Sequence, residues 1–324
     1  MSEKNPSKWQ AAITGEWHGI PTVFEPDGTA VGNNKVSRAS EFVDGKTTYW
    51  LEADFQGAGP IATRFDMGKS RMSFGVIDSD QDRIYCGPDF IGGGRPFGML
   101  VDSNYYSPFW NTDLRTVNLV LPDRKLQVYS SLFHEGPTIV AVQNGLYTVT
   151  QDHATNPDTQ AFVSGFLERE RAIGRKQHVL PVKYSGQWRG TLQVHNADQS
   201  YLGEIAVVIT HTPLSLTRAQ KHIEITGVLT HSWNYTHSRA ANHHQFEGPD
   251  LFGNGIAYGR FLFATRHVFG KALKIKSRET LLIDDNEALA VVWNLHKSDR
   301  EQVVAFGVLD WHPDDLVMSE VHLG

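Results

Sequence analysis

The sequence predicts an all-β protein made of two tandem antiparallel β-barrels, on three observations. The first is an internal repeat: Gly15-Glu16-Trp17-His18-Gly19 near the start of the chain is matched by Gly186-Gln187-Trp188-Arg189-Gly190. The second is a series of short segments in both halves, rich in β-branched and aromatic residues and separated by turn sequences. The third is the scarcity of helical periodicity, which disfavours a βαβ fold.

The repeat predicts the domain organisation. The two Gly-x-Trp triplets lie 171 residues apart in a chain of 324, a period too long for a solenoid unit and suited to a duplicated domain. We expect one barrel over residues 1–165 and the other over 180–324. In each barrel the glycine lets the first strand bend, and the indole of Trp17 or Trp188 closes one end. A chance match among 29 Gly and 8 Trp is the alternative.

The elements follow from the local pattern. Residues 7–14 are expected to form a short helix that closes the first barrel, and residues 162–173 a short linker helix between the barrels. The clearest strands of the first half are residues 47–55, 71–77, 116–121 and 126–133. Those of the second half are residues 203–212, 221–229, 260–269, 273–283, 288–295 and 302–310.

Composition excludes several classes of protein. The chain is 40% hydrophobic and 20% charged with a net charge of −6, and it has no run of Lys or Arg, so nucleic acid is not an expected partner. No apolar run approaches the roughly 18 residues needed to span a bilayer, so no membrane partner is expected. A polar N-terminus and the single Cys86, which has no intramolecular partner, lead us to expect a cytoplasmic location.

Familiar catalytic motifs are missing from the sequence. It contains no G-x-S-x-G, no H-E-x-x-H and no phosphate-binding P-loop. The run Gly92-Gly93-Gly94 opens no visible helix, so we expect a flexible loop there and not a phosphate cradle.

One strand-like segment of the second half predicts a binding face. Period-two alternation places His231, Trp233, Tyr235, His237 and Arg239 together, while the opposite face carries only small polar residues. A face of large aromatic and cationic side chains suits the wall of a cavity for an aromatic ligand. We therefore expect His231, His237 and Arg239 to be catalytic, and Trp233 and Tyr235 to bind the substrate.

Two other interpretations of that face are open. The segment is equally compatible with a partly exposed hairpin. The segment could also bind a metal ion, because its histidines lie on the same face of the strand. Six residues along a strand separate His231 from His237 by about 20 Å, however, which disfavours one shared ion. We therefore expect no metal.

In the first half, Arg64, Asp89 and Arg95 are the polar residues nearest the aromatic-rich stretches, and they are further candidates for substrate binding. Solvated surface charges are the alternative interpretation for each. Residues 105–110 pack aromatic pairs around a Ser-Pro turn, which is typical of a loop at a barrel mouth or of an interface patch.

With these motifs the chain resembles the cyanobacterial two-domain calycin (lipocalin-like) proteins. Length and domain plan are also similar to the cyclases of cyanobacterial scytonemin biosynthesis. Besides the Gly-x-Trp openings, the resemblance rests on the closing stretches Leu281-Leu282-Ile283-Asp284-Asp285-Asn286 and Ala290-Val291-Val292-Trp293.

The resemblance implies two lipocalin-like barrels and a cofactor-independent cyclase, a lyase of pigment biosynthesis. Its substrate would be the indole-containing β-keto acid formed from indole-3-pyruvate and 4-hydroxyphenylpyruvate, which cyclises with loss of carbon dioxide. In that reaction Arg239 would hold the carboxylate while a histidine protonates the carbonyl oxygen. The implied partner is a small aromatic substrate, and whether the chain forms a homo-oligomer is left open.

Two alternatives to the cyclase stay open. One is a non-catalytic carrier of a hydrophobic pigment or other small molecule, since barrels of this kind hold ligands in their interior. The other is a different calycin-type enzyme, such as a carotenoid hydratase or a bilin lyase.

Overall fold

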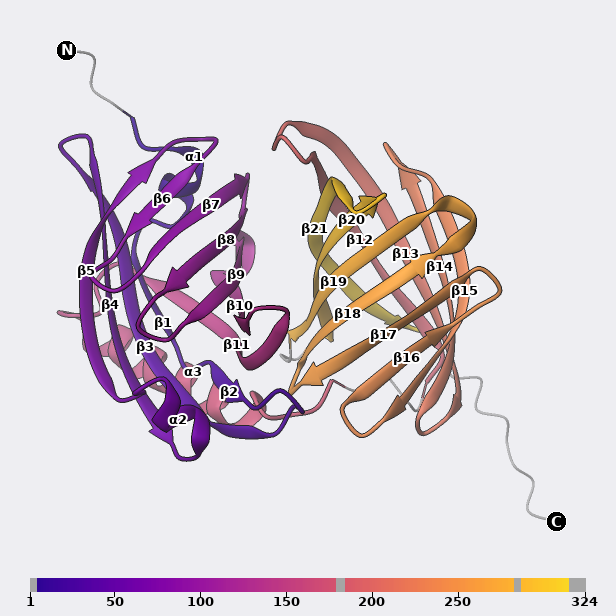
Figure 1. The fold of residues 1–324 in the computed structure, drawn as a ribbon, viewed down its shortest axis with the longest axis horizontal. Helices are drawn as coiled ribbons and strands as arrows, with labels where there is room; N and C mark the ends of the chain where they lie inside the picture. Colours follow the sequence, from indigo (N-terminus) through magenta and orange to yellow (C-terminus); the bar gives the residue numbers. More distant parts are fainter. Residues whose placement is uncertain (1–4, 179–183, 283–286, 315–324) are drawn as a thin grey trace. The chain divides into compact units, whose positions relative to one another are not determined.

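Each half of the chain closes into an antiparallel β-barrel, as the repeat predicts (Figure 1). The computed structural model describes residues 5–178, 184–282 and 287–314. Part of the acidic closing stretch, residues 283–286, therefore lies outside the described residues.

The first barrel is a meander in which consecutive strands pair from β3 to β11. The short strands β1 and β2 share one position in the ring and complete it, because each pairs with both β3 and β11. The strands are β1 (Glu16–Gly19), β2 (Thr22–Phe24), β3 (Ala30–Val43), β4 (Lys46–Gly57), β5 (Lys69–Asp78), β6 (Arg83–Cys86), β7 (Ile91–Phe97), β8 (Leu100–Ser107), β9 (Thr112–Leu121), β10 (Leu126–Glu135) and β11 (Thr138–Thr150).

The second barrel is also a closed meander, in which the first strand, β12, pairs with both β13 and β21. Its strands are β12 (Gly186–Asn196), β13 (Tyr201–Ser215), β14 (Arg218–Gly227), β15 (His231–Ala240), β16 (His243–Glu247), β17 (Leu251–Tyr258), β18 (Phe261–Val268), β19 (Leu273–Leu282), β20 (Ala288–Lys297) and β21 (Arg300–Pro313). The two 3-10 turns are η1 (Pro122–Arg124) and η2 (Phe269–Lys271).

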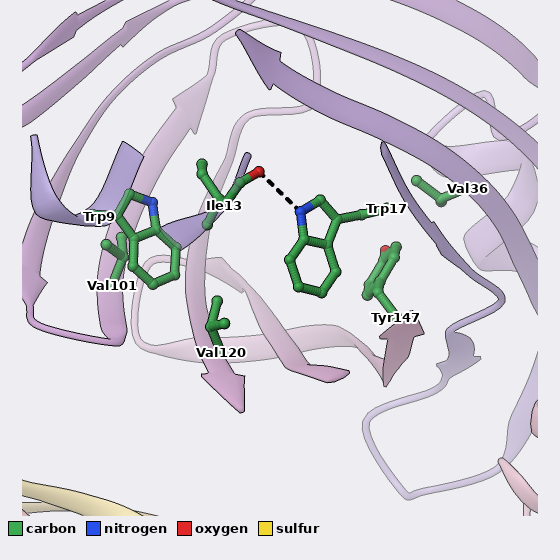
Figure 2. Packing of buried hydrophobic residues seen from close by; sticks show 7 residues of the cluster. All are labelled: Trp9, Ile13, Trp17, Val36, Val101, Val120 and Tyr147. Carbon is green, nitrogen blue, oxygen red and sulfur yellow. Dashed lines mark hydrogen bonds between the residues drawn. The ribbon is translucent and has the colours of Figure 1, made fainter. Parts of the chain in front are cut away.

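A short helix closes one end of the first barrel. Helix α1 (Lys8–Ala12) begins after Ser7, whose hydroxyl accepts a hydrogen bond from the backbone N–H of Gln10 at 3.0 Å. Trp9 and Ile13 pack beside Trp17, and the Trp17 indole donates to the carbonyl of Ile13 at 3.0 Å (Figure 2). Trp17 is only 4% exposed, so the burial expected for this indole is confirmed.

The repeated tryptophan of the second barrel is buried too. Trp188 is 2% exposed, and its ring centroid lies 5.1 Å from that of Trp311 on β21. The two Gly-x-Trp motifs therefore place equivalent buried indoles on the first strand of each barrel.

The other end of the first barrel carries helix α2 (Pro60–Arg64), in the connection from β4 to β5 (Figure 1). Ile61 and Phe65 are buried there in a cluster with Val23 and Phe133. Helices α1 and α2 thus lie at opposite ends of this barrel, and the interior between them forms the site described below.

The predicted linker helix starts earlier than expected. Helix α3 spans Pro157–Ile173, because Asn156 caps it by accepting from the backbone N–H groups of Asp158 and Thr159. The chain divides into two compact units, Met1–Gln177 with Ala257–Phe261, and His178–Ile256 with Leu262–Gly324. The main boundary falls between the two expected domain ranges. Among the described helices, none is both long and apolar enough to cross a bilayer.

Candidate functional site

The interior of the first barrel holds a cavity of about 430 Å³. This volume is within the usual range for small-molecule sites, roughly 300–1,000 Å³. Trp9, Ile13 and Trp17 line its closed end, beside α1. The segment after α2, the β6–β7 turn and the β8–β9 turn form the rim at the other end.

Aromatic rings form one wall of the cavity. Phe74 lies 5.0 Å from Tyr49 and 5.0 Å from Phe90, and Tyr105 lies 4.9 Å from Tyr85, measured between ring centroids. Tilted and edge-to-face pairs at these separations are favourable for aromatic side chains. The wall is therefore preorganised by its own ring contacts.

The glycine run makes room for this wall. Gly92, Gly93 and Gly94 lie in strand β7, so the expectation of a flexible loop is wrong. A Cβ on Gly92 would lie 2.6 Å from Tyr105 Cδ1, and one on Gly94 would lie 2.9 Å from the Tyr85 hydroxyl oxygen. Two positions of the run are glycine because neighbouring tyrosines occupy the space of a side chain.

A second aromatic group surrounds the rim. Phe65 lies 5.3 Å from Trp110 and 5.3 Å from Phe133 between ring centroids, and all three line the cavity. Phe109 is 73% exposed and also lines it. Residues 105–110, predicted to be a loop at the barrel mouth, therefore belong partly to the end of β8 and partly to this rim.

A buried arginine faces the cavity. Arg38 lies on the inward face of β3 with Asn34 and Ser40, and it is 9% exposed. Its Nη2 donates to Asn118 Oδ1 at 3.1 Å and to Gln127 Oε1. Within the described parts of the chain, no carboxylate forms an ion pair with Arg38.

Tyrosine rings surround the same guanidinium, whose Cζ lies 4.0 Å from the ring centroid of Tyr147 and 5.5 Å from that of Tyr129. Burial raises the pKa of Tyr129 to about 12 even though Arg38 opposes the shift. Burial also raises the pKa of Tyr49, which is hydrogen-bonded to Arg38. These phenols are therefore neutral near pH 7 and leave the positive charge of Arg38 uncompensated.

Of the three residues predicted in the first half, one borders the cavity and two form ion pairs elsewhere. Asp89 is exposed and lines the rim of the cavity. Arg64 pairs with Glu135 at 2.9 Å, and Arg95 pairs with Asp102 at 3.0 Å. Neither arginine is among the residues that line the cavity.

The predicted face of the second barrel has the expected alternation. Trp233, Tyr235 and His237 on β15 are buried, whereas His231 and Arg239 are half-buried. His231 stacks on Trp233 with ring centroids 5.1 Å apart, and its Nδ1 lies 3.1 Å from Lys271 Nζ.

Strand β16 brings a further histidine to this face. His237 Nε2 lies 2.7 Å from His244 Nδ1. Burial lowers the pKa of His244 to about 3 and that of His178 to about 4, so both are neutral near pH 7.

A buried ion pair lies near these histidines. Arg266 donates to Ser277 Oγ at 2.9 Å and to Glu279 Oε1 at 2.8 Å. Although burial favours the protonated carboxyl, Arg266, His178 and Lys221 lower the pKa of Glu279 to about 2. Burial lowers the pKa of Lys221 to about 8. This network is polar, in contrast to the aromatic cavity of the first barrel. Several of its buried nitrogens, among them both ring nitrogens of His178 and Nδ1 of His237, have no hydrogen-bond partner within the described part of the chain.

Sequence reasoning missed Arg38, Asn118 and Gln127. A signal was present, because period two over residues 30–43 puts Arg38 on the same face as the apolar Val36. A charged residue on such a face predicts a buried charge. Which groups pair with it is not visible in the sequence, because its partners lie 80 and 89 residues away.

Comparison with known proteins supports the fold alone. No protein-family model matches the chain, and no curated protein matches it. A solved structure of a DUF3598-family protein of unknown function from Nostoc punctiforme is similar, with a TM-score of 0.55 and 10% sequence identity over 96% of this chain and 100% of that one.

A putative AttH from Nitrosomonas europaea is 8% identical over 91% of this chain and 92% of that one, and its TM-score of 0.16 carries no argument. The chain thus shares the two-barrel fold of the Nostoc DUF3598 protein.

Proposed function

We propose that the first barrel binds a small aromatic carboxylate, with Arg38 as the partner of the anion. The observation that carries the proposal is a buried guanidinium facing an aromatic cavity, whose partners among the described residues are amides and tyrosines. A buried charge without an opposite charge is strongly destabilising. An anionic ligand would supply the missing charge.

Other buried arginines of the chain support this interpretation by contrast. Arg83 pairs with Asp78, and Arg266 pairs with Glu279. In those two cases the protein itself supplies the carboxylate. Arg38 faces the cavity, so the ligand takes the place of that carboxylate while its ring packs on the aromatic wall.

The catalytic form of the proposal is the reaction implied by the resemblance to the scytonemin cyclases. An indole carbon of the β-keto acid would attack the ketone carbon and later lose its proton, while the carbonyl electron pair moves to oxygen and takes up a proton. The bond to the carboxylate would then break, releasing carbon dioxide. Its electron pair would form a carbon–carbon double bond as the new hydroxyl takes up a proton and leaves as water.

The attack on the ketone carbon places negative charge on oxygen before protonation. The cationic Arg38 and the neutral phenol of Tyr49 are suited to stabilise that charge, because fixed donors in a water-poor site act strongly on a developing oxyanion. The carrier remains the second candidate, since an aromatic cavity of this volume also fits a ligand that is held without reaction.

The first test is a fluorescence titration with indole-3-pyruvate. Arg38→Met should weaken binding about ten- to a hundredfold, the equivalent of a lost charge-assisted contact. Arg64→Met, which removes a paired arginine that does not line the cavity, is the matched control and should bind like the parent. Unchanged affinity in Arg38→Met contradicts the proposal.

Turnover separates the enzyme from the carrier and one barrel from the other. Carbon dioxide release from the β-keto acid by the parent protein is expected for the cyclase, and binding without release for the carrier. Loss of release in Arg38→Met supports a site in the first barrel. Loss in His237→Ala and Arg239→Ala with full activity in Arg38→Met instead supports a site on β15.

A further inference from the structure

Strand β1, which begins within the Gly-x-Trp motif, carries a buried histidine on the face opposite to Trp17. His18 is 1% exposed, and its ring lies between two hydroxyls. Nδ1 lies 3.0 Å from Ser37 Oγ and Nε2 lies 3.2 Å from Thr150 Oγ1. The register explains the first contact, because His18 is directly opposite Ser37 on β3.

Two further metal-binding side chains converge on this histidine. Glu16 lies two residues earlier on the same face of β1, and its Oε2 is 3.9 Å from His18 Nε2. The ring centroid of His153 is 4.1 Å from that of His18. One ligand atom from each of the three residues lies within 4.8 Å of the other two.

The turn that carries His153 is held in place. The Asp152 carboxylate accepts from Asn156 Nδ2 at 2.6 Å and from Thr159 Oγ1 at 2.8 Å. Gln160 Nε2 also donates to the carbonyl oxygen of His153 at 2.9 Å. The start of α3 therefore fixes the backbone of the third residue near the other two.

From this geometry we propose that Glu16, His18 and His153 bind a zinc ion on the outer face of the first barrel. Two imidazoles and a carboxylate with a water in the fourth position form a familiar zinc set. A Ser37 hydroxyl that accepts the Nδ1 proton leaves a lone pair on His18 Nε2, which a metal ion would take over from the Thr150 hydroxyl. A hydrogen bond from the other ring nitrogen is the outer-shell arrangement of many metal-bound histidines.

Binding requires only a small local movement. Ligand atoms around a tetrahedral zinc lie about 3.3 Å apart, given Zn–N distances of about 2.0–2.1 Å. Glu16 and His153 are half-buried, so these two side chains can close the gap while the contact between Nδ1 and Ser37 holds His18 in place. The bound ion would link β1 to the turn before α3.

The test is a calorimetric titration of the chelator-treated full chain with zinc chloride. The parent should bind one ion per chain with a dissociation constant of about 1 µM or tighter, and the melting temperature should rise. His153→Ala and Glu16→Gln should each weaken binding at least tenfold without unfolding the protein, because both side chains are half-buried. Cobalt substitution should give the visible absorption of a tetrahedral site in the parent and not in His153→Ala.

His267→Ala removes an exposed histidine on β18 and is the matched control, with binding like the parent. Arg38→Met should also bind zinc normally, so this inference stands or falls separately from the ligand in the cavity. A stoichiometry of zero, or zinc affinity in His153→Ala equal to that of the parent, overturns the proposal.

Discussion

Arg38 on β3 donates a hydrogen bond to Asn118 Oδ1 on β9 at 3.1 Å, a pairing of a buried cation with a neutral amide. Arg83 at the closed end of the same barrel pairs with the carboxylate of Asp78. One buried arginine is thus neutralised by a carboxylate, and the other has none within residues 5–178, 184–282 and 287–314.

This difference predicts opposite effects on stability. Arg83→Met leaves Asp78 buried without its partner and should lower the free energy of unfolding by about 3–5 kcal/mol. Arg38→Met removes an uncompensated charge and should leave stability equal or higher. Urea denaturation of the three proteins measures both effects, and an equal loss in the two variants would show that Arg38 is structurally paired like Arg83.

The tryptophan plugs predict a second effect on stability. Trp17→Ala and Trp188→Ala should each lower the free energy of unfolding by about 3–5 kcal/mol, because each removes a large buried ring. Thermal unfolding followed by circular dichroism measures the loss. A melting temperature within about a degree of the parent would mean that the indole does not close its barrel.

The glycine run predicts a difference between adjacent positions. Gly92→Ala places a Cβ against the Tyr105 ring and should disturb the cavity wall, lowering both stability and affinity for indole-3-pyruvate. Gly93→Ala is the control, because the nearest atom to its new Cβ would be 3.9 Å away. Melting temperature and fluorescence titration compare the two, and equal behaviour would argue against tight packing at Gly92.

The histidines of the second barrel predict that stability falls with acid. The folded pKa of His178 is lowered to about 4 from an ordinary value of 6.5. Between these values the unfolded chain binds the extra proton, so the free energy of unfolding rises with pH across this window and is fully regained above 6.5. For His178 alone, the free energy of unfolding above pH 6.5 should exceed that below pH 4 by about 3 kcal/mol.

His244 and the carboxyl of Glu279 act in the same direction, the latter between its ordinary value of 4.5 and about 2. Urea denaturation from pH 4 to pH 7.5 measures the slope, which should flatten in His178→Gln. A free energy of unfolding that does not change from pH 6.5 to pH 4 would contradict the neutral, buried state of these histidines.

The sequence predicted what depends on local periodicity and repetition. Trp17 and Trp188 revealed the two barrels because each starts a strand at an equivalent point of the repeat. The side chains of Trp233, Tyr235 and His237 were placed together correctly because alternation along one strand fixes a shared face.

What the sequence did not predict depends on long-range pairing. Arg38 becomes distinctive only when β9 and β10 bring Asn118 and Gln127 to it, in place of a carboxylate. The glycine run resembled a loop because the two tyrosines that fill its space come from neighbouring strands. A glycine-rich composition alone does not distinguish a loop from a strand that packs against large rings.

The proposed role of Arg38 is tested most directly by the ratio of two dissociation constants, those of indole-3-pyruvate and its methyl ester. The parent should bind the acid about ten- to a hundredfold more tightly than the uncharged ester, since only the acid neutralises the guanidinium. In Arg38→Met this preference should vanish while the affinity for the ester is kept. A preference for the acid that persists in Arg38→Met would show that another group holds the anion.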